Sequence, residues 1–319
     1  MNVFVADKFE SAGLDALKSA GFEVAYTPGL SGDELARSVE ASKADVLIVR
    51  STRVPANVID KAPNLRLIVR AGSGVDTIDV PAATRRGVRV CNCPGQNSVA
   101  VAELTLGLMI ALDRRIVDET EDLRQRVWNK KEYSKARGLK GRALGIVGLG
   151  RIGIEVAKRA AAFEMKLLYV DIVPRPDLEK SLGLRHVGMH ELLRESDFIT
   201  LHVPGGPKTH HLIGREELSL MKPTAFILNC SRGGIIDEQA MSEAVKAGRL
   251  GGAALDVYEV EPGASETEFR DPVVLTPRVY GTHHVGASTE QAQLAVAEET
   301  VRIVKAFHDE GQYLNCVNP

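Results

Sequence analysis

Three residue types that suit acid–base chemistry on a small carboxylic acid occur in three separate loops of this sequence. Arg232 lies in the segment Asn-Cys-Ser-Arg-Gly-Gly and Glu261 in Asp-Val-Tyr-Glu-Val-Glu-Pro. The third segment, His-His-Val-Gly-Ala-Ser-Thr, offers either His283 or His284. An arginine beside a glycine pair at a strand end is suited to bidentate recognition of a carboxylate. A histidine titrates in the range needed to take up a hydroxyl proton, and a neighbouring carboxylate favours its charged form. Together the three residues predict proton removal from a hydroxy acid.

Each residue taken alone also fits a structural role, as a surface arginine, a solvated loop acid or a structural histidine. His283 stands beside His284, and adjacent residues of an extended loop point opposite ways, so at most one of them should face a cleft. The pair His210 and His211 lies in a polar turn, and we interpret it as solvated. The functional interpretation depends on all three residues following strands of one cofactor-binding sheet.

The motif Gly-Leu-Gly-Arg-Ile-Gly connects an expected strand, residues 143–147, to an expected helix, residues 154–163. A strand, a glycine turn and a helix in this order are typical of dinucleotide-binding sites. Gly148 permits the tight turn, Gly150 lets the backbone approach a pyrophosphate, and Gly153 lets helix and strand pack closely. The start of the helix then presents free N–H groups and a positive dipole end to the phosphates.

Asp171 indicates which dinucleotide binds. It ends the next expected strand, residues 166–170, about 20 residues past the last glycine, where this motif places a ribose-binding acid. A carboxylate there accepts hydrogen bonds from the adenosine ribose diol and repels a 2′-phosphate. The sequence therefore predicts NAD rather than NADP, although Arg175 lies close to the same position.

The composition narrows the class of protein. With 319 residues, 44% hydrophobic and 26% charged, two soluble globular domains are expected. A net charge of −2 gives no reason to expect nucleic acid or an anionic membrane as a partner. No apolar run approaches the roughly 20 residues of a membrane span, and no targeting segment follows Met1. The four cysteines form no CxxC pair, so we expect reduced cytoplasmic thiols and no metal site.

Strands alternate with helices along the chain, which predicts two parallel α/β sheets. The helix expected from Ser98 to Arg115 is apolar nearly all round, so it should be buried between domains or in a subunit interface. Strands of the first sheet are expected at residues 2–6, 22–26, 45–49, 65–69 and 87–91, and strands of the second at residues 143–147, 166–170, 198–203, 225–229, 252–256 and 273–276.

The order of the four motifs resembles that of the D-isomer-specific 2-hydroxyacid dehydrogenases over essentially the whole chain, and Arg70–Asp76 and Asn97–Glu103 are similar to the phosphoglycerate dehydrogenase subgroup. The resemblance implies a substrate-binding domain of residues 1–96 and 288–319, with a Rossmann-like NAD-binding domain of residues 97–287 inserted into it. It implies a homodimer through the helix of residues 98–115. It also implies NAD-dependent oxidation of a D-2-hydroxy acid to a 2-oxo acid, above all of 3-phosphoglycerate to 3-phosphohydroxypyruvate in serine biosynthesis.

The resemblance further implies roles for single residues. Arg232 would bind the substrate carboxylate and carbonyl, Glu261 would pair with the histidine, and His284 would be the acid and base. The implied substrate-binding residues are Arg50, Arg70, Ser73, Gly74, Val75 and Arg232. The implied cofactor-binding residues are Ser73, Gly148, Gly150, Arg151, Ile152, Gly153, Asp171, Val203, Pro204, Cys230, Ser231, Arg232, Asp256, His284, Gly286 and Ala287.

Two features depart from the family pattern. Proline usually precedes the catalytic histidine, where His283 stands here, so an exchange of roles between His283 and His284 is the alternative to the motif's own register. The chain also stops at Val317–Pro319, where longer relatives carry serine-binding regulatory domains, so we expect a short form without that feedback. Two alternative functions are a glyoxylate or hydroxypyruvate reductase of the same fold and an NAD-sensing, corepressor-like protein without enzymatic activity.

Overall fold

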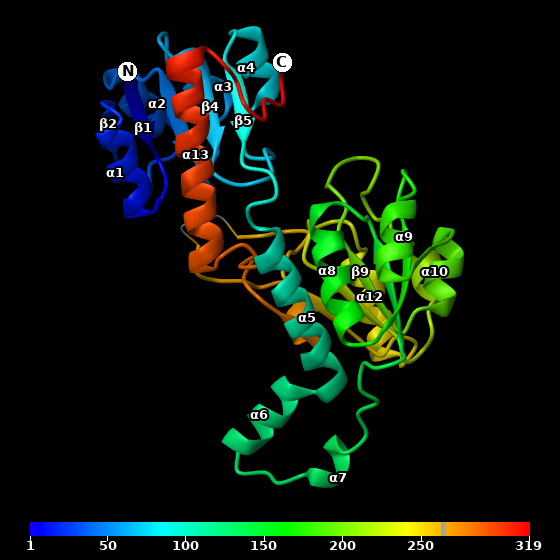
Figure 1. Cartoon of the computed structure of the whole chain (residues 1–319). Helices are drawn as coiled ribbons and strands as arrows, with labels where there is room; N and C mark the ends of the chain where they lie inside the picture. Colours follow the sequence, from blue (N-terminus) through cyan, green and yellow to red (C-terminus); the bar gives the residue numbers. More distant parts are fainter. Residues whose placement is uncertain (263–265) are drawn as a thin grey trace. The chain divides into compact units, whose positions relative to one another are not determined.

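The computed structural model describes residues 1–262 and 266–319. The chain divides into two compact units, one formed by Met1–Asn97 with Ala287–Pro319 and the other by Ser98–Gly286 (Figure 1). Each unit contains a parallel sheet with helices, so the predicted α/β fold class with two parallel sheets is confirmed. No helix among the described residues is long and apolar enough to span a membrane.

The first unit is a five-stranded parallel sheet in the order β2-β1-β3-β4-β5, as in flavodoxin-like folds. Its central strand β3 reads Val-Leu-Ile-Val and is buried throughout, because helices cover both faces of the sheet. The strands are β1 (Asn2–Val5), β2 (Glu23–Tyr26), β3 (Val46–Val49), β4 (Leu67–Arg70) and β5 (Arg89–Asn92). The helices are α1 (Ser11–Ser19), α2 (Gly32–Ala41), α3 (Ala56–Asp60), α4 (Val80–Arg85) and α13 (Glu290–Glu310).

The last helix of the chain completes this first unit. α13 packs against α1 and β4, and its residues Ile303, Val304 and Phe307 lie in the same core as Val46 and Leu67. Its apolar residues follow helical spacing, so one stripe of the helix faces the sheet. The two ends of the sequence therefore build one hydrophobic core.

The second unit is a seven-stranded parallel sheet in the order β12-β11-β10-β9-β6-β7-β8. The order reverses between β6 and β9, and such a switch point is where open α/β sheets bind ligands. The strands are β6 (Ala143–Val147), β7 (Lys166–Val170), β8 (Leu184–His186), β9 (Phe198–Leu201), β10 (Phe226–Asn229), β11 (Gly252–Leu255) and β12 (Val279–Gly281). The helices are α5 (Ser98–Arg114), α6 (Ile116–Arg124), α7 (Lys130–Tyr133), α8 (Arg151–Ala162), α9 (Pro176–Leu182), α10 (Met189–Glu195), α11 (Arg215–Leu220), α12 (Glu238–Lys246) and the 3-10 turn η1 (Pro272–Leu275).

The strand predicted at residues 273–276 is wrong. The segment forms the 3-10 turn η1, in which the Asp271 carboxylate accepts a hydrogen bond from the Val273 N–H at 2.9 Å and Pro272 occupies the first turn. Val273 is buried in the core of this unit, whereas Leu275, two residues later, is 82% exposed. The strand lies a few residues later, at Val279–Gly281. Hydrophobic periodicity cannot separate a short apolar turn from a short strand, and the aspartate–proline start was the overlooked signal.

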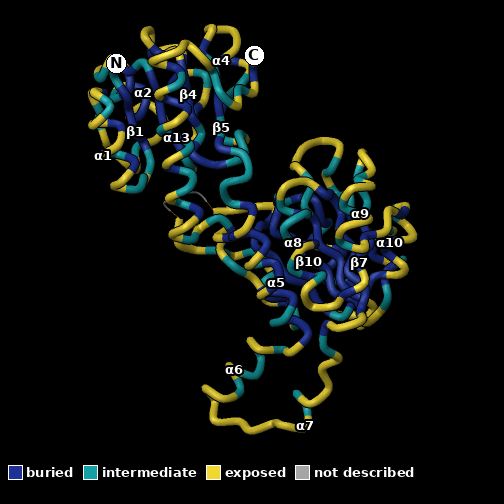
Figure 2. The backbone as a smooth tube through the Cα atoms, in the orientation of Figure 1, coloured by how far each residue is buried: buried dark blue, intermediate teal, exposed yellow. Residues whose placement is uncertain are grey.

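The apolar helix α5 is buried mainly within its own unit, against α8, β10 and β11. This packing accounts for most of its apolar residues, whereas Val99 remains 43% exposed. In contrast, α6 and α7 contain no buried residue, and Figure 2 shows this segment as largely exposed.

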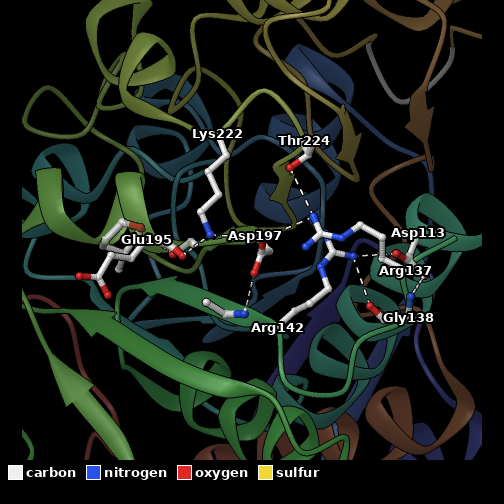
Figure 3. A network of polar contacts seen from close by, with 11 residues as sticks. Asp113, Arg137, Gly138, Arg142, Glu195, Asp197, Lys222 and Thr224 are labelled. Carbon is white, nitrogen blue, oxygen red and sulfur yellow. Dashed lines mark hydrogen bonds and ion pairs between the residues drawn. The ribbon is translucent and has the colours of Figure 1, made fainter.

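Buried charges anchor the amino ends of the strands in the second unit (Figure 3). Arg142, just before β6, donates to the Asp113 carboxylate of α5 at 2.7 Å, and its guanidinium lies over the Phe198 ring. The Asp197 carboxylate accepts the Ala143 N–H at 3.0 Å and pairs with Lys222 at 3.2 Å. These bonds fix α5, β6 and β9 at the end of the sheet opposite to the predicted site.

Candidate active site

The predicted residues of the second unit lie at the carboxyl ends of its strands. Gly148 follows β6, Asp171 follows β7, and Cys230 follows β10; Asp256 follows β11 and His284 lies in the loop after β12. Because all seven strands are parallel, these loops share one edge of the sheet. This is the edge where open α/β sheets bind ligands.

Each of the three glycines in the glycine loop meets a different structural requirement. Gly148 has φ +93°, and a Cβ there would lie 2.5 Å from the His202 carbonyl oxygen. A Cβ at Gly153 would overlap the Gly148 carbonyl oxygen, so only glycine allows α8 to begin so close to β6. At Gly150 no atom lies within 4 Å of an added Cβ. The space beside Gly150 is therefore open to a ligand.

The amino end of α8 fits a pyrophosphate. Gly150 is its N-cap residue and has no side chain that could accept hydrogen bonds from the first N–H groups of the helix. These N–H groups can therefore donate to a ligand. Arg151 and Ile152, both predicted to contact the cofactor, form the first turn. Open space, unsatisfied donors and the positive end of the helix dipole together suit the phosphates of NAD.

Asp171 is held against this loop. Its carboxylate accepts the Leu149 N–H at 2.6 Å and the Val173 N–H at 3.2 Å. The nearby Arg175 forms an exposed ion pair with the Asp177 carboxylate at 3.1 Å, which partly offsets its charge. The local charges therefore favour an unphosphorylated ribose.

Glu261 and His284 are in direct contact. His284 Nδ1 lies 2.8 Å from Glu261 Oε2, and Glu261 Oε1 accepts the Tyr258 N–H at 3.2 Å. Burial raises the pKa of Glu261, but the hydrogen bond and charge of His284, the Tyr258 N–H and the charge of Arg232 outweigh it, so the net shift is downward. Glu261 is therefore held as a carboxylate beside the imidazole.

The histidine loop has an unusual backbone. His284 has φ +52°, the left-handed region that non-glycine residues seldom adopt, and its side chain is 50% exposed. Such a conformation persists when surrounding bonds over-determine it, and it is common at functional sites. The partner of Glu261 is His284 and not His283, which favours the register predicted from the motif.

Asp256 supplies the bonds that hold this loop. Its buried carboxylate accepts the Thr282 hydroxyl at 2.6 Å and the N–H groups of Val285 and Gly286, each at 2.8 Å. A Cβ at Gly286 would lie 2.9 Å from the same carboxylate. Three bonds leave one of about four lone-pair positions, so contact with the cofactor carboxamide stays a prediction.

Arg232 lies on a loop tied down by Asn229, which the sequence analysis quoted but gave no role. The Asn229 amide oxygen accepts the Ser231 N–H and hydroxyl at 3.1 and 2.7 Å, and its amide nitrogen donates to the Arg232 carbonyl at 2.8 Å. The Arg232 side chain donates to the Ser231 carbonyl at 2.7 Å and lies across Gly205. A Cβ at Gly233 would overlap the Tyr258 carbonyl, so this loop packs directly on the Glu261 segment.

Tyr258 is a second residue whose role the sequence analysis missed. Its hydroxyl donates to the Thr282 carbonyl at 3.0 Å and so joins the glutamate loop to the histidine loop. Burial raises the pKa of this phenol to about 12, and it stays neutral and able to donate. A tyrosine three residues after an apolar strand was the available signal, because a tyrosine hydroxyl that becomes buried needs a partner.

The remaining cofactor-side residues of this unit line the same edge. Burial raises the pKa of the Cys230 thiol to about 12, so the thiol stays protonated and acts as a small apolar side chain and not as a nucleophile. Val203 contacts the position where a Cβ of Gly148 would lie, and Pro204 is exposed at the start of the next loop. Contacts of these residues with a cofactor stay predictions.

The predicted substrate residues of the first unit lie at the carboxyl ends of two neighbouring strands. Arg70 ends β4 in register with Val49 of β3, and Arg50 follows directly. Arg50 donates to the Gln293 side-chain oxygen at 3.0 Å, while the Arg70 side chain lies against the backbone of Gly72. The two arginines therefore share one edge of this sheet.

Two further contacts fix these loops. The Asp7 carboxylate accepts the N–H groups of Arg50, Ser51 and Thr52 at 2.6, 3.1 and 3.0 Å, a role the sequence analysis missed. The Ser73 hydroxyl donates to the Asn97 amide oxygen at 3.0 Å. Gly74 and Val75 follow it, half-buried, and Ala287 begins the return of the chain to this unit.

Comparison with known proteins places the chain in a family. A family model described as D-isomer specific 2-hydroxyacid dehydrogenase, NAD binding domain, matches residues 106–286. A D-3-phosphoglycerate dehydrogenase of Methanocaldococcus jannaschii is 45% identical over 311 residues, which are 96% of this chain and 58% of that protein. A hydroxypyruvate reductase of Thermotoga maritima is 44% identical over 88% of this chain and 89% of that protein. The structure of D-lactate dehydrogenase from Aquifex aeolicus complexed with NAD and lactic acid has a TM-score of 0.87 and 30% identity, covering 100% of this chain and 99% of that one.

The similarity to phosphoglycerate dehydrogenases that the motifs indicated is confirmed, at 41–45% identity for three of them. This chain spans only 53–58% of the length of those three proteins. NAD as the predicted cofactor is confirmed by the family model, which is that of an NAD-binding domain and covers the glycine loop. The chain belongs to the D-isomer-specific 2-hydroxyacid dehydrogenase family, and residues 106–286 match its NAD-binding domain.

Proposed function

We propose that the chain catalyses NAD-dependent oxidation of a D-2-hydroxy acid to the 2-oxo acid. The observation that carries this proposal is the 2.8 Å contact between His284 and Glu261, at the same sheet edge as Gly150 and the amino end of α8. NAD, when bound, supplies the hydride acceptor. A general base for the hydroxyl proton is the other requirement of this reaction, and the imidazole meets it.

Arg232, Glu261 and His284 form the proposed catalytic triad, and each has a role in the oxidation that its chemistry permits. His284 takes the hydroxyl proton at Nε2, because Nδ1 faces Glu261. The Glu261 carboxylate stabilises the imidazolium that results and keeps the ring oriented. Arg232 holds the substrate carboxylate through paired N–H donors and polarises the carbonyl as it forms. Asp256, Asn229 and Tyr258 hold the loops on which these residues lie.

We propose 3-phosphoglycerate as the substrate, oxidised to 3-phosphohydroxypyruvate for serine biosynthesis. The proposal is supported by the 41–45% identical phosphoglycerate dehydrogenases and by Arg50 and Arg70, which share a sheet edge and would bind the phosphate. A hydroxypyruvate or glyoxylate reductase is the second candidate, because relatives of those names are 44% and 41% identical over most of their own length.

Substrate identity is tested by initial rates with 3-phosphoglycerate, hydroxypyruvate, glyoxylate and other 2-hydroxy acids, followed by absorbance of the reduced nicotinamide. Arg50→Ala and Arg70→Ala should each raise KM for 3-phosphoglycerate by about 10- to 100-fold, since a charge-assisted hydrogen bond contributes roughly 1.5–3 kcal/mol. KM for glyoxylate should change little. Arg53→Ala, an exposed arginine of the loop after Arg50, is the matched control and should leave both constants unchanged.

Two outcomes would contradict this assignment. Equal effects of the arginine variants on both substrates would favour the reductase. Tight NAD binding without turnover of any acid would favour the NAD-sensing alternative.

We also propose that the protein is a cytoplasmic homodimer that pairs through α5 and through the arm that follows it, residues 116–133, which contains α6 and α7. Exposed Val99 on α5 and the exposed apolar residues after it support this proposal.

A further inference from the structure

A histidine pair and a glutamate gather beside the candidate active site. His210 and His211 lie in the loop after β9 and Glu259 in the loop after β11, and their potential ligand atoms all lie within 4.8 Å of one another. His211 Nε2 is 3.1 Å from Glu259 Oε1, and the two imidazole rings stack with centroids 4.0 Å apart. We propose that these three side chains bind a divalent transition metal ion of the zinc class.

The backbone at each ligand is fixed by a hydrogen bond. The His211 N–H donates to the Gly234 carbonyl at 2.7 Å, and the His210 N–H donates to the Gly206 carbonyl at 3.0 Å. The Glu259 N–H donates to the buried carboxylate of Glu238 at 2.7 Å. A metal ion therefore has to order side chains and not loops, which keeps the entropic cost of binding low.

His211 also has a left-handed backbone, with φ +48°. This conformation is uncommon for a residue with a side chain, and here it places the imidazole against Glu259. Like the turn at His284, it is a local strain that the surrounding hydrogen bonds maintain.

The donor set selects the kind of ion. Two imidazole nitrogens and one carboxylate oxygen suit zinc and its neighbours, whereas magnesium and calcium prefer oxygen ligands alone. Three protein ligands leave a fourth tetrahedral position for water. With zinc–ligand bonds of about 2.1 Å, ligand atoms lie roughly 3.4 Å apart, so the most distant pair has to close by about 1.4 Å. The two stacked imidazole rings also have to turn, because each nitrogen lone pair lies in the plane of its ring. The His211 and Glu259 side chains are 37% and 38% exposed, which leaves them room to do so.

The test is calorimetric titration of the full-length, tag-free, metal-stripped protein with zinc sulfate, without NAD or substrate. We expect one high-affinity ion per chain. His211→Ala and Glu259→Ala should each weaken binding by more than about tenfold, because even residues that only support a zinc ligand contribute that much. His190→Ala, an exposed histidine of α10, is the matched control and should bind zinc like the wild type.

Two other places could take up zinc and need their own variants. His284→Ala removes the pair with Glu261, and Cys316→Ser removes the partly exposed thiol. Both should retain the zinc site, and bound cobalt should show a tetrahedral visible spectrum that His211→Ala abolishes. The proposal is overturned by no binding up to about 100 μM zinc, by full binding in His211→Ala, or by loss of binding in His284→Ala or Cys316→Ser instead. None of these measurements depends on turnover, so they stand apart from the test of the dehydrogenase.

Discussion

The carboxylates of the candidate site accept most of their hydrogen bonds from backbone N–H groups. Asp171 accepts from Leu149, and Asp256 accepts from Val285 and Gly286. Each such bond fixes a loop before any ligand arrives. Catalytic groups held in this way lose little entropy on binding and keep the geometry that proton transfer needs.

His284→Ala is expected to lower kcat by roughly 10²- to 10⁴-fold, the usual contribution of a general acid–base group. The affinity for NAD should stay near that of the wild type, because the glycine loop and Asp171 are untouched. Rates are measured by reduced-nicotinamide absorbance and NAD affinity by calorimetry. The neighbouring variant His283→Ala is the control and should be active, since His283 is not the partner of Glu261. An active His284→Ala would remove the proposed base, and an inactive His283→Ala would exchange the two roles.

Side chains that act through the backbone were the part of the site that the sequence could not predict. The glycine loop and Asp171 were predictable, because spacing along one strand–turn–helix unit determines where they lie. Asn229, Tyr258 and Asp7 act by bonding to loops that only the folded sheet brings near. Nothing in the local sequence distinguishes Asn229 and Asp7 from ordinary turn residues, and the position of Tyr258 after a strand does not show which loops its hydroxyl joins.

Element boundaries show the same limit at a larger scale. Long periodic segments such as α8 and α13 were predictable from apolar spacing, whereas the short run before β12 was not. A run of three or four apolar residues carries too little periodicity to choose between strand and turn. The fold was predictable because it rests on the alternation of many elements and not on any single boundary.

The buried pair of Arg142 and Asp113 joins α5 to the start of β6, and its side chains are only 7% and 4% exposed. Asp113→Ala should destabilise the protein by about 3–5 kcal/mol, because it leaves a buried charge without its partner. Urea unfolding followed by circular dichroism measures the loss. Glu191→Ala, which breaks the exposed pair with Arg185, should cost no more than about 1 kcal/mol. Combining Asp113→Leu with Arg142→Met should restore most of the stability, and failure to do so would mean that the cost lies in packing.

Asp197 gives the same region a pH dependence. Burial raises the pKa of its carboxyl, but the Ala143 N–H, Lys222 and Arg142 outweigh it, so the pKa is net lowered. A carboxyl whose pKa is lower in the folded than in the unfolded protein stabilises the fold at a pH above its unfolded-state pKa, about 3.9. This stabilisation is lost as the pH falls through the folded-state pKa. Wild type should therefore exceed Asp197→Asn in unfolding free energy at pH 7 and 5, and the gap should shrink below about pH 4. Urea unfolding at each pH measures it, with the exposed Asp33→Asn as control. A gap independent of pH would assign the effect of Asp197 to hydrogen-bond geometry alone.

On the scale of the whole molecule, apolar exposure is unevenly distributed. Ile116, Val117, Leu123, Val127 and Trp128 are 46%, 51%, 56%, 44% and 80% exposed, and all lie within one arm of the second unit. Figure 2 shows this arm as mostly exposed tube. Soluble proteins seldom leave so many large apolar side chains uncovered in one segment, and aromatic residues are enriched in the cores of interfaces.

We therefore predict that the protein in solution has twice the mass of one chain. Leu123→Asp or Trp128→Asp should lower the measured mass to that of one chain. An aspartate buried in an apolar interface loses its water without gaining a partner, which costs several kcal/mol. Such a cost raises the dissociation constant of the dimer by about a thousandfold, so that the variants should be monomers at micromolar concentration. Light scattering after size exclusion measures the mass, and circular dichroism verifies that the variants remain folded. Leu275→Asp is the matched control, because that leucine is 82% exposed on η1, outside the arm. A dimer that survives both substitutions would place the interface elsewhere, whereas a monomeric wild type would mean that the arm is free in solution.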